Sequence, residues 1–572
     1  MADDGHVPWW RDAVVYQIYP RSFLDTDGDG IGDLPGIERR LDHLSWLGVD
    51  AVWISPFYRS PMADFGYDVS DYCDVDPLFG TLADADRLVA AAHQRGIRVL
   101  VDWVPNHTSD RHPWFLESRS SRSSPKRDWY HWRDGREGAP PNNWRAVFGG
   151  PAWTLDEATR QWYLHLFLPQ QPDLNWSNPE VVDAMHRVLR FWLDRGVDGF
   201  RIDVVHCIGK DPAFPDQPAE LGEIDRVGLQ NEPATHKLIR GFRRLVDGYP
   251  GDRTTVGEVN LRDLAAIASF YGRGDELHMV FNFLPLQAPW TKAAWHDMIE
   301  QVERELPAGA WPSWVLSNHD VSRVRTRLGS EQAARAAAVV LTTQRGTPFV
   351  YQGDELGLKD AIVPRKRRLD PGGRDGCRAP LPWEAGHCHG WPVTPWLPWP
   401  PDSDARNATS ERANRQSMLH LYRDLLAARR ASPALRRGTV RLHEAPEDVL
   451  AYERVSGQDR RLVLVNFGDH PVDVPLSEPW QVEVASAKQR QAGLLPPHGA
   501  ALLRPPALGP LCGRLRAGSL RGKRMSRACS QEEWTDISAE TRRRGWTRSA
   551  TAPATSPNPL QSDSLSPPTP ES

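Results

Sequence analysis

Seven polar or charged residues stand at the ends of short apolar runs that predict β-strands. They are Asp102, His107, Arg201, Asp203, Glu258, His319 and Asp320. If the strands are parallel and close into a barrel, these ends share one rim, where barrel enzymes hold their reacting groups. Charged side chains are costly to gather away from water unless a function keeps them there. We therefore expect a catalytic site built from these residues.

Two of the carboxylates have different expected surroundings. Period-two alternation places Arg201 and Asp203 on one strand face, where the guanidinium would keep Asp203 ionised, as a nucleophile requires. Glu258 follows an apolar stretch, a less charged setting that would raise its pKa and suit a general acid/base. Retaining cleavage of glycosides uses such a contrast between two carboxyl groups ~5–5.5 Å apart.

The other rim residues suit sugar recognition. Asp320 would accept hydrogen bonds from substrate hydroxyls, and His107 and His319 would donate hydrogen bonds to the sugar. His206 and Lys210, in the loop after Asp203, either reach a second sugar subsite or are polar groups of the loop.

The order of elements predicts the scaffold. Strands are expected at 13–20, 49–56, 96–105, 197–205, 253–259, 278–283, 312–320 and 347–355, with helices such as 82–95, 179–195 and 331–344 between them. Eight such alternations predict an α/β fold, a closed (β/α)8 or TIM barrel formed by residues 1–108 and 179–436. Residues 109–178 are too long for a simple connection and predict a subdomain inserted after the third strand. Short strands over 437–512 predict a C-terminal antiparallel β-sandwich, and the Arg-, Ser- and Pro-rich stretch 513–572 predicts a disordered tail.

Composition excludes several classes of protein. The 572 residues carry a net charge of −5, which argues against nucleic acid or an anionic membrane as a partner. No apolar run reaches the ~18 residues of a membrane helix. The start, Met1-Ala-Asp-Asp-Gly-His, lacks a signal pattern, so we expect a cytoplasmic protein. Six cysteines without a C-x-x-C pair exclude a disulfide scaffold and a cysteine-zinc module.

Tryptophan is unusually frequent, with 24 residues against 12 Tyr and 16 Phe. Indole rings often lie where a flat apolar face stays accessible, and the C–H faces of sugars pack well on them. We expect some tryptophans of the rim loops, the insertion and the segment after the eighth strand to contact sugar. These are Trp53, Trp103, Trp114, Trp129, Trp132, Trp144, Trp153, Trp162, Trp176, Trp383, Trp391, Trp396 and Trp399.

Seven motifs together resemble glycoside hydrolase family 13, the α-amylase family, in its α-glucosidase and oligo-1,6-glucosidase branch. They are DWVPNH (102–107), GFRID (199–203), GEV (257–259), SNHD (317–320), VDAVWISPFY (49–58), QPDLN (171–175) and GTPFVYQGDELG (346–357). RDGCRAPLPW (374–383) also matches this branch, and the resemblance covers roughly residues 8–505. It implies Asp203 as nucleophile, Glu258 as acid/base and Asp320 as transition-state stabiliser. It also implies a sugar subsite formed by Asp64, Tyr67, His107, Arg201, His319 and Arg323.

A metal site is expected in the first loop, where Asp25, Asp27 and Asp29 alternate and Gly30 follows. This spacing resembles the start of a calcium loop, although Gly36 stands where an EF-hand would have Glu, so Asp33 would close the site. The family resemblance supports a structural Ca2+ here, with the Ile31 carbonyl as a further ligand. No organic cofactor is implied.

The expected activity is that of a retaining exo-acting α-glucosidase on short oligosaccharides. Val204 follows the nucleophile, and in this branch Val there tends to accompany α-1,6 activity, but one methyl is worth only ~1–3 kcal/mol of discrimination. Both α-1,4 and α-1,6 linkages stay open. The alternatives are a transglycosylase or isomerase of the same family, such as a glucosyltransferase or trehalose synthase. A non-catalytic transporter partner is disfavoured because Asp203, Glu258 and Asp320 are all present.

Overall fold

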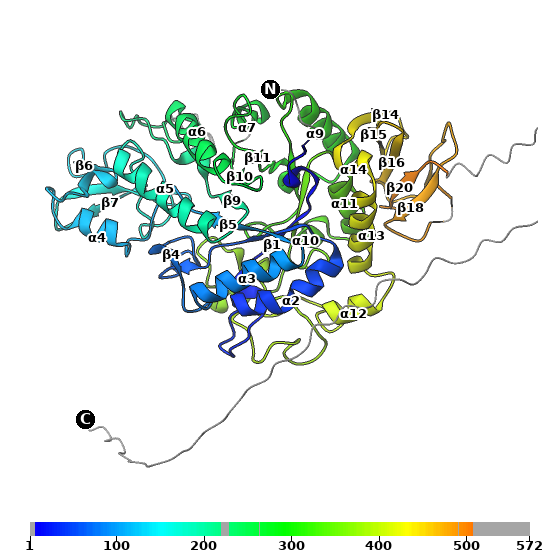
Figure 1. Ribbon diagram of the computed structural model, residues 1–572, viewed down its shortest axis with the longest axis horizontal. Helices are drawn as coiled ribbons and strands as arrows, with labels where there is room; N and C mark the ends of the chain where they lie inside the picture. Colours follow the sequence, from blue (N-terminus) through cyan, green and yellow to red (C-terminus); the bar gives the residue numbers. More distant parts are fainter. Residues whose placement is uncertain (1–5, 219–227, 262, 490, 507–572) are drawn as a thin grey trace, which may run out of the picture. The chain divides into compact units, whose positions relative to one another are not determined.

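The structure is a computed structural model that describes residues 6–218, 228–261, 263–489 and 491–506 (Figure 1). The expected tail, 513–572, lies outside the described residues, as do the last residues expected for the C-terminal domain. Among the helices that the structure describes, none combines the length and the apolar character needed to span a membrane.

Eight parallel strands form the central barrel. They are β1 (Val15–Ile18), β2 (Ala51–Ile54), β5 (Arg98–Trp103), β9 (Gly199–Ile202), β10 (Thr254–Gly257), β11 (Met279–Val280), β12 (Ser313–Val315) and β13 (Thr347–Tyr351). Their order is β11-β10-β9-β5-β2-β1-β13-β12, so each strand lies beside its sequence neighbours and β1 pairs with β13. Between β11 and β12, the Ser313 hydroxyl donates to the Val280 carbonyl (2.8 Å). The predicted TIM barrel is confirmed as a nearly closed barrel.

Helices surround the barrel, and polar caps fix where they begin. Thr81 and Asp84 form a capping box at α3 (Leu82–Gln94), while Asn178 and Ser330 cap α5 (Pro179–Asp194) and α11 (Glu331–Thr343). The helices that follow the barrel strands include α2 (Leu34–Leu47), α3 (Leu82–Gln94), α5 (Pro179–Asp194), α6 (Pro233–Asp247), α7 (Leu264–Ser269), α9 (Lys292–Glu305), α11 (Glu331–Thr343) and α13 (Met418–Ala431). The three helices predicted from the sequence begin and end within about one residue of their expected bounds.

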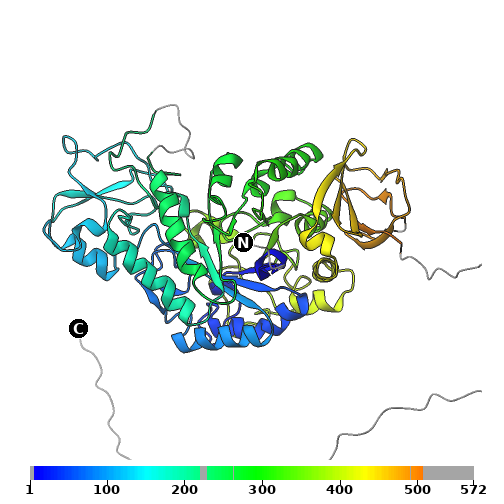
Figure 2. The same cartoon turned by 45° about the horizontal axis from the view of Figure 1, so that its top comes forward.

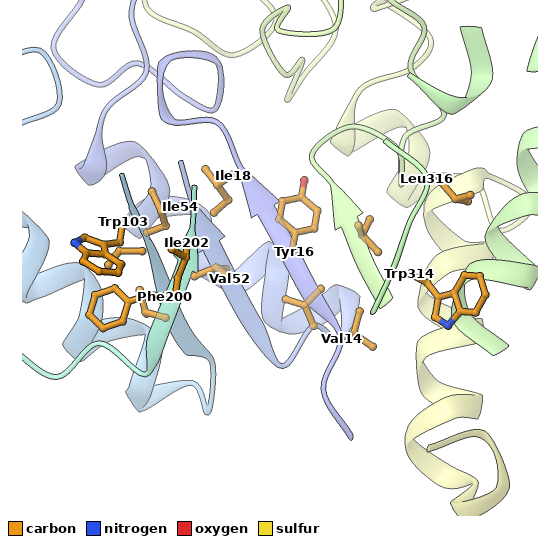
Figure 3. Packing of buried hydrophobic residues seen from close by; sticks show 14 of the residues in the cluster. Val14, Tyr16, Ile18, Val52, Ile54, Trp103, Phe200, Ile202, Trp314 and Leu316 are labelled. Atoms are coloured by element: carbon orange, nitrogen blue, oxygen red, sulfur yellow. The ribbon is translucent and has the colours of Figure 1, made fainter. Parts of the chain in front are cut away.

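The period-two alternation of the strands separates two apolar layers. Tyr16 and Ile18 of β1 pack outward with Val52 and Ile54 of β2 against the helices (Figure 3). The alternate residues, such as Val15 and Trp53, fill the barrel interior together with Phe281 and Phe349. This rigid interior lies beneath the polar ends of the strands.

The segment between β5 and α5 forms its own small structure. It contains α4 (Pro113–Arg119) and a three-stranded antiparallel sheet, ordered β6 (Trp132–Arg133), β8 (Gln161–Leu164) and β7 (Trp153–Asp156). The loop after β9 packs against it, because Phe214 contacts Trp144 and Trp153, and the Trp144 indole donates to the Pro215 carbonyl (2.6 Å). The sequence did not reveal that the loop after β9 packs against the inserted segment.

The C-terminal region is an antiparallel two-sheet structure. Its larger sheet has the order β14 (Thr439–His443), β15 (Val449–Ser456), β16 (Asp459–Asn466), β20 (Ala500–Arg504) and β18 (Gln481–Ala485), and its smaller sheet pairs β17 (Val472–Asp473) with β19 (Leu494–Leu495). Val449 and Ala451 pack toward the small sheet, whereas Leu450 and Tyr452 pack toward the barrel helices. Figure 2 shows the larger sheet, in gold and orange, beside those helices.

Candidate active site

A pocket of about 740 Å³ opens at the carboxyl ends of the barrel strands. Asp203 follows β9, Glu258 follows β10 and Asp320 lies just beyond β12, and all three line the pocket. Asp64, Tyr67 and His107 line it as well, so the structure brings these predicted residues together. Arg201 and His319 lie directly behind the lining, in contact with it.

Arg201 joins the carboxylates of the pocket floor. One guanidinium nitrogen donates to Asp203 (2.7 Å) and to Asp102 (2.8 Å), and the other donates to Glu258 (2.5 Å). Glu258 also accepts a hydrogen bond from the Val204 amide (3.2 Å). The expected less charged setting of Glu258 is therefore wrong, since this carboxylate shares a cation with Asp203.

Burial has the largest effect on the pKa values of Asp203 and Asp102 at the pocket floor. It raises the pKa of Asp203 well above its ordinary range, and Arg201 offsets only part of that rise. The expectation that Arg201 would keep Asp203 ionised is corrected, because burial outweighs the guanidinium and the sequence does not show the depth of burial. Burial likewise raises the pKa of Asp102, which the sequence placed at the rim without a role, to about 6.

Asp320 has the opposite electrostatic setting. Arg374 and Arg378 donate to the same Asp320 oxygen (3.0 and 3.1 Å), and His319 lies 3.4 Å from the other oxygen. Burial by itself would raise the pKa of Asp320, but His319 and the two arginines hold it below its ordinary range. Asp320 is therefore the carboxylate best kept ionised.

Tyr67 and the two histidines form a linked wall. The Tyr67 hydroxyl contacts His319 Nε2 (2.7 Å) and donates to Asp102 (3.1 Å), and its ring stacks on His319. Gln171 lies 3.1 Å from both His107 and the Asp64 carboxylate. Burial lowers the pKa of His107 to about 4 and that of His319 to about 3, so both rings are neutral near pH 7.

The structure does not bring Arg323 to the pocket. Its guanidinium is fully buried behind the strands, donates to the Gln352 carbonyl (2.6 Å) and lies over the Tyr351 ring. Arg374 is the arginine that reaches the pocket, where it also donates to Asp64 (2.6 Å). The RDGCRAPLPW stretch pointed to this region, but its spacing alone does not show which arginine turns inward.

The sequence left open whether His206 and Lys210 reach a sugar, and the structure places the two side chains differently. His206 lines the pocket, and its Nδ1 lies 3.2 Å from the Glu258 carbonyl. Lys210 turns away into the interior, where its ammonium pairs with Asp173 (3.0 Å) and donates to Asn106 (2.9 Å). Lys210 therefore holds the site together rather than reaching a sugar.

The inserted segment forms one wall of the pocket. Val147, Phe148, Leu166 and Phe167 line it, and the Phe148 ring contacts the Arg374 guanidinium at 5.3 Å. None of the described residues that line the pocket is a tryptophan. The expected sugar contacts of Trp are therefore corrected: these indoles pack among other side chains, as Trp103 does against Phe242 and Trp144 against Phe214.

Comparison with known proteins agrees with this geometry. A profile of the alpha-amylase catalytic domain matches residues 17–438, and a profile described as a domain of unknown function (DUF3459) matches residues 435–502. The first match covers more than half of the chain. This protein belongs to the alpha-amylase family.

Relatives of this alpha-amylase-family protein place it among the glycoside hydrolases. A probable alpha-glucosidase of Rhizobium meliloti (strain 1021) is 44% identical over 81% of this chain and 90% of its own length. An oligo-1,6-glucosidase of Parageobacillus thermoglucosidasius is 38% identical over 81% of this chain and 91% of its own length. The crystal structure of an alpha-glucosyl transfer enzyme is 41% identical with a TM-score of 0.82, and that of a trehalulose synthase mutant is 36% identical with a TM-score of 0.83. Each covers 87% of this chain and all of the solved chain.

The family's expected metal loop is partly assembled. One carboxylate oxygen from each of Asp25, Asp27 and Asp29 lies within 4.8 Å of the others. Asp33 is not in this cluster: it caps α2 through the Gly36 amide (2.6 Å) and accepts from the Thr26 amide and hydroxyl. The Ile31 amide donates to Asp29 (2.7 Å), and the Ile31 carbonyl as a ligand stays a prediction.

Proposed function

We propose that this glycoside hydrolase is a retaining, exo-acting α-glucosidase of short oligosaccharides. The observation that carries this is the placement of Asp203 and Glu258 on two nitrogens of one Arg201 guanidinium. That arrangement keeps the two carboxylates close, as attack by an enzyme carboxylate requires, whereas inverting enzymes leave room for a water between carboxyl groups ~6.5–9.5 Å apart.

The proposed reaction has two displacements. In the first, an Asp203 oxygen bonds to the anomeric carbon, the glycosidic bond breaks, and Glu258 gives its proton to the departing oxygen. In the second, Glu258 takes a proton from water, the water oxygen bonds to the anomeric carbon, and Asp203 leaves. The configuration is inverted twice, so the released glucose is the α-anomer.

The Asp203→Ala variant tests the assignment: it should lose hydrolysis of nitrophenyl α-glucoside, and survival of that activity would exclude this mechanism.

Exo action is supported by the closed side of the pocket. Phe148 of the insertion contacts Arg374, which in turn donates to both Asp64 and Asp320, so these residues form one continuous side of the pocket. A glucose seated there at the non-reducing end of a chain leaves no path for further sugars beyond it. A long glucan with blocked non-reducing ends should therefore resist the enzyme, and efficient internal cleavage would contradict exo action.

Linkage preference rests on the turn after the nucleophile. Val204 lines the pocket with a φ of +33°, and its amide binds Glu258. Relatives named for α-glucosidase and for oligo-1,6-glucosidase activity are both similar to the chain. We therefore propose activity on both linkages, to be measured by comparing products from maltose, isomaltose, sucrose and trehalose.

Glucosyl transfer is the second candidate. It is favoured by the similarity to an alpha-glucosyl transfer enzyme and to a trehalulose synthase over 87% of this chain. The same covalent intermediate serves either outcome, and only the acceptor differs. At high maltose concentration, a hydrolase yields glucose as its main product, whereas a transferase yields trisaccharides as its main product.

A structural Ca2+ is proposed in the loop of Asp25, Asp27 and Asp29. Calcium takes about 6–8 oxygen ligands, of which the three carboxylates would supply part, and the ion would relieve repulsion among them. Calcium should raise the melting temperature relative to EDTA. The Asp29→Asn variant should lose that shift, whereas the exposed Asp134→Asn variant should keep it. An equal shift in both variants would contradict the site.

A further inference from the structure

Residues 361–376 form a compact loop above the eighth strand. The Ala361 amide donates to the Gly376 carbonyl (3.0 Å), so the two ends of the loop meet, as in an Ω-loop. Ala361 and Val363 anchor it in a small apolar cluster with Ala379 and Leu397. The inner arm of this loop reaches the active site, because Pro371, Gly372 and Arg374 line the pocket.

The outer end of the loop carries four consecutive cations, Arg365, Lys366, Arg367 and Arg368, which we call the basic tip. All four side chains are exposed on or beside a short 3-10 turn. Within the described part of the chain, none of the four forms an ion pair with a carboxylate. Among the described residues, the Arg368 Nε of the basic tip donates to the Val363 carbonyl (3.4 Å). Such a cluster repels itself, and it is unusual in a chain with a net charge of −5.

The basic tip is tied to the pocket wall. The Leu369 and Asp370 amides donate to the Asp375 carboxylate (3.0 and 3.2 Å), and Asp370 in turn accepts from Arg374. Three residues lie between Arg368 and Gly372, so four Cα–Cα steps of about 3.8 Å place their Cα atoms at most about 15 Å apart. An arginine side chain turned toward the pocket would shorten that gap toward the ~8 Å over which charges act at physiological salt.

Even with Arg201 and Arg378 directly behind its lining, the pocket holds more carboxylates than cations and would repel an anionic substrate. Asp64, Asp203, Glu258 and Asp320 line it, and Arg374 is the one arginine or lysine in its described lining. A cationic cluster at the edge of the pocket would offset that repulsion for a glucoside whose anionic group lies outside the part of the pocket that holds the glucose. Guanidinium groups also bind carboxylates through paired hydrogen bonds.

We propose that the basic tip makes this enzyme prefer α-glucosides whose leaving group carries an anionic group, such as a glucosylated sugar acid. This inference rests on the proposed α-glucosidase function. The glucose enters the pocket, and the acidic leaving group stays near the loop end, where Arg365, Lys366, Arg367 and Arg368 attract it.

Two matched substrate pairs test the proposal. Maltobionate and maltitol share an open-chain leaving group and differ by a carboxylate against a hydroxymethyl group; isomaltobionate and isomaltitol are the 1,6-linked pair. The variant R365Q/K366Q/R367Q/R368Q removes the charge, and R365K/R367K/R368K keeps it. At low salt, the glutamine variant should lose about tenfold in the ratio of kcat/KM for the acid over the neutral partner, and the lysine variant should keep that ratio. Added salt should lower the ratio for the unmodified enzyme.

Nitrophenyl α-glucoside separates failure of this proposal from failure of the proposed function. Its hydrolysis should be equal in the unmodified enzyme and both variants, and no hydrolysis in any of them would reject the α-glucosidase function itself. An unchanged acid-to-neutral ratio in the glutamine variant would overturn the role of the basic tip. If the glutamine variant lost binding to heparin but kept its acid-to-neutral ratio, the proposal would also be overturned, because the basic tip would then bind an anionic macromolecule.

Discussion

Arg201 and the carboxylates around it set the chemistry at the scale of single residues. Asp203, Glu258 and Asp102 all contact this one guanidinium, so a change in one carboxylate alters the others. The sequence predicted Arg201, Asp203 and Glu258 from strand alternation and motifs. It could not predict their protonation, because that depends on burial and on how three separate strands converge.

The pH dependence of activity should respond to Asp102. Its negative charge raises the pKa of Asp203, on top of the larger effect of burial, and Asp203 must be ionised to attack. In the Asp102→Asn variant that contribution is gone, so Asp203 ionises at lower pH and the acid limb of kcat/KM moves down. A full pH profile measures this. An acid limb that stays in place or moves up would contradict the assignment of Asp203.

Lys210 should matter for stability. Its ammonium is buried against Asp173, Asn106 and the Cys207 carbonyl. The Lys210→Met variant leaves Asp173 as an unpaired buried charge, which should cost about 3–5 kcal/mol of unfolding free energy. Calorimetry should show a lower melting temperature that Asp173→Asn partly restores in the double variant. The exposed Lys237→Met serves as the control, and additive losses in the double variant would speak against the pair.

At the scale of elements, the pocket needs the inserted segment and the 361–376 loop besides the barrel. The strands were predictable because each is a short apolar run followed by a polar residue, and helices such as α3 begin at a recognisable cap. The inward turn of the 361–376 loop was not predictable, so Arg323 was expected at the sugar where Arg374 stands. Contacts between segments far apart in the chain, such as Phe148 with Arg374, leave no local pattern in the sequence.

The wall formed by the insertion should contribute to binding. The Phe148→Ala variant removes the ring over Arg374 and a contact with Phe167, a loss of about 1 kcal/mol or roughly fivefold in KM for nitrophenyl α-glucoside. The exposed Leu116→Ala, on α4 of the same insertion, should leave KM unchanged. Equal effects of both substitutions would indicate a general loosening of the insertion instead.

At the scale of the whole molecule, the C-terminal sheet completes the packing of the barrel. The Tyr452 hydroxyl contacts the Thr343 hydroxyl (2.5 Å) at the end of α11, and Leu450, Val463 and Leu502 pack into the main core. The motifs placed this region after the barrel, but they did not show that one face of its sheet covers barrel helices.

A chain that ends at Arg437 should therefore not behave as an independent barrel. Removal of the sheet exposes the apolar faces of α11 and α13, and such patches cause aggregation. Size-exclusion chromatography and dye binding measure this against the full chain. A monomeric, active truncated chain would contradict the structural role of the sheet.

Removal of 513–572 alone should leave activity intact.

The central claim is that Asp203 forms a covalent glucosyl-enzyme and that Glu258 removes it. The most direct measurement is mass spectrometry of the Glu258→Gln variant after incubation with α-glucosyl fluoride, whose leaving group needs no acid. We predict one added glucosyl unit, located on the peptide that contains Asp203 and absent from the Asp203→Ala/Glu258→Gln double variant. An adduct on another residue, or β-glucose as the first product of the unmodified enzyme, would contradict the account.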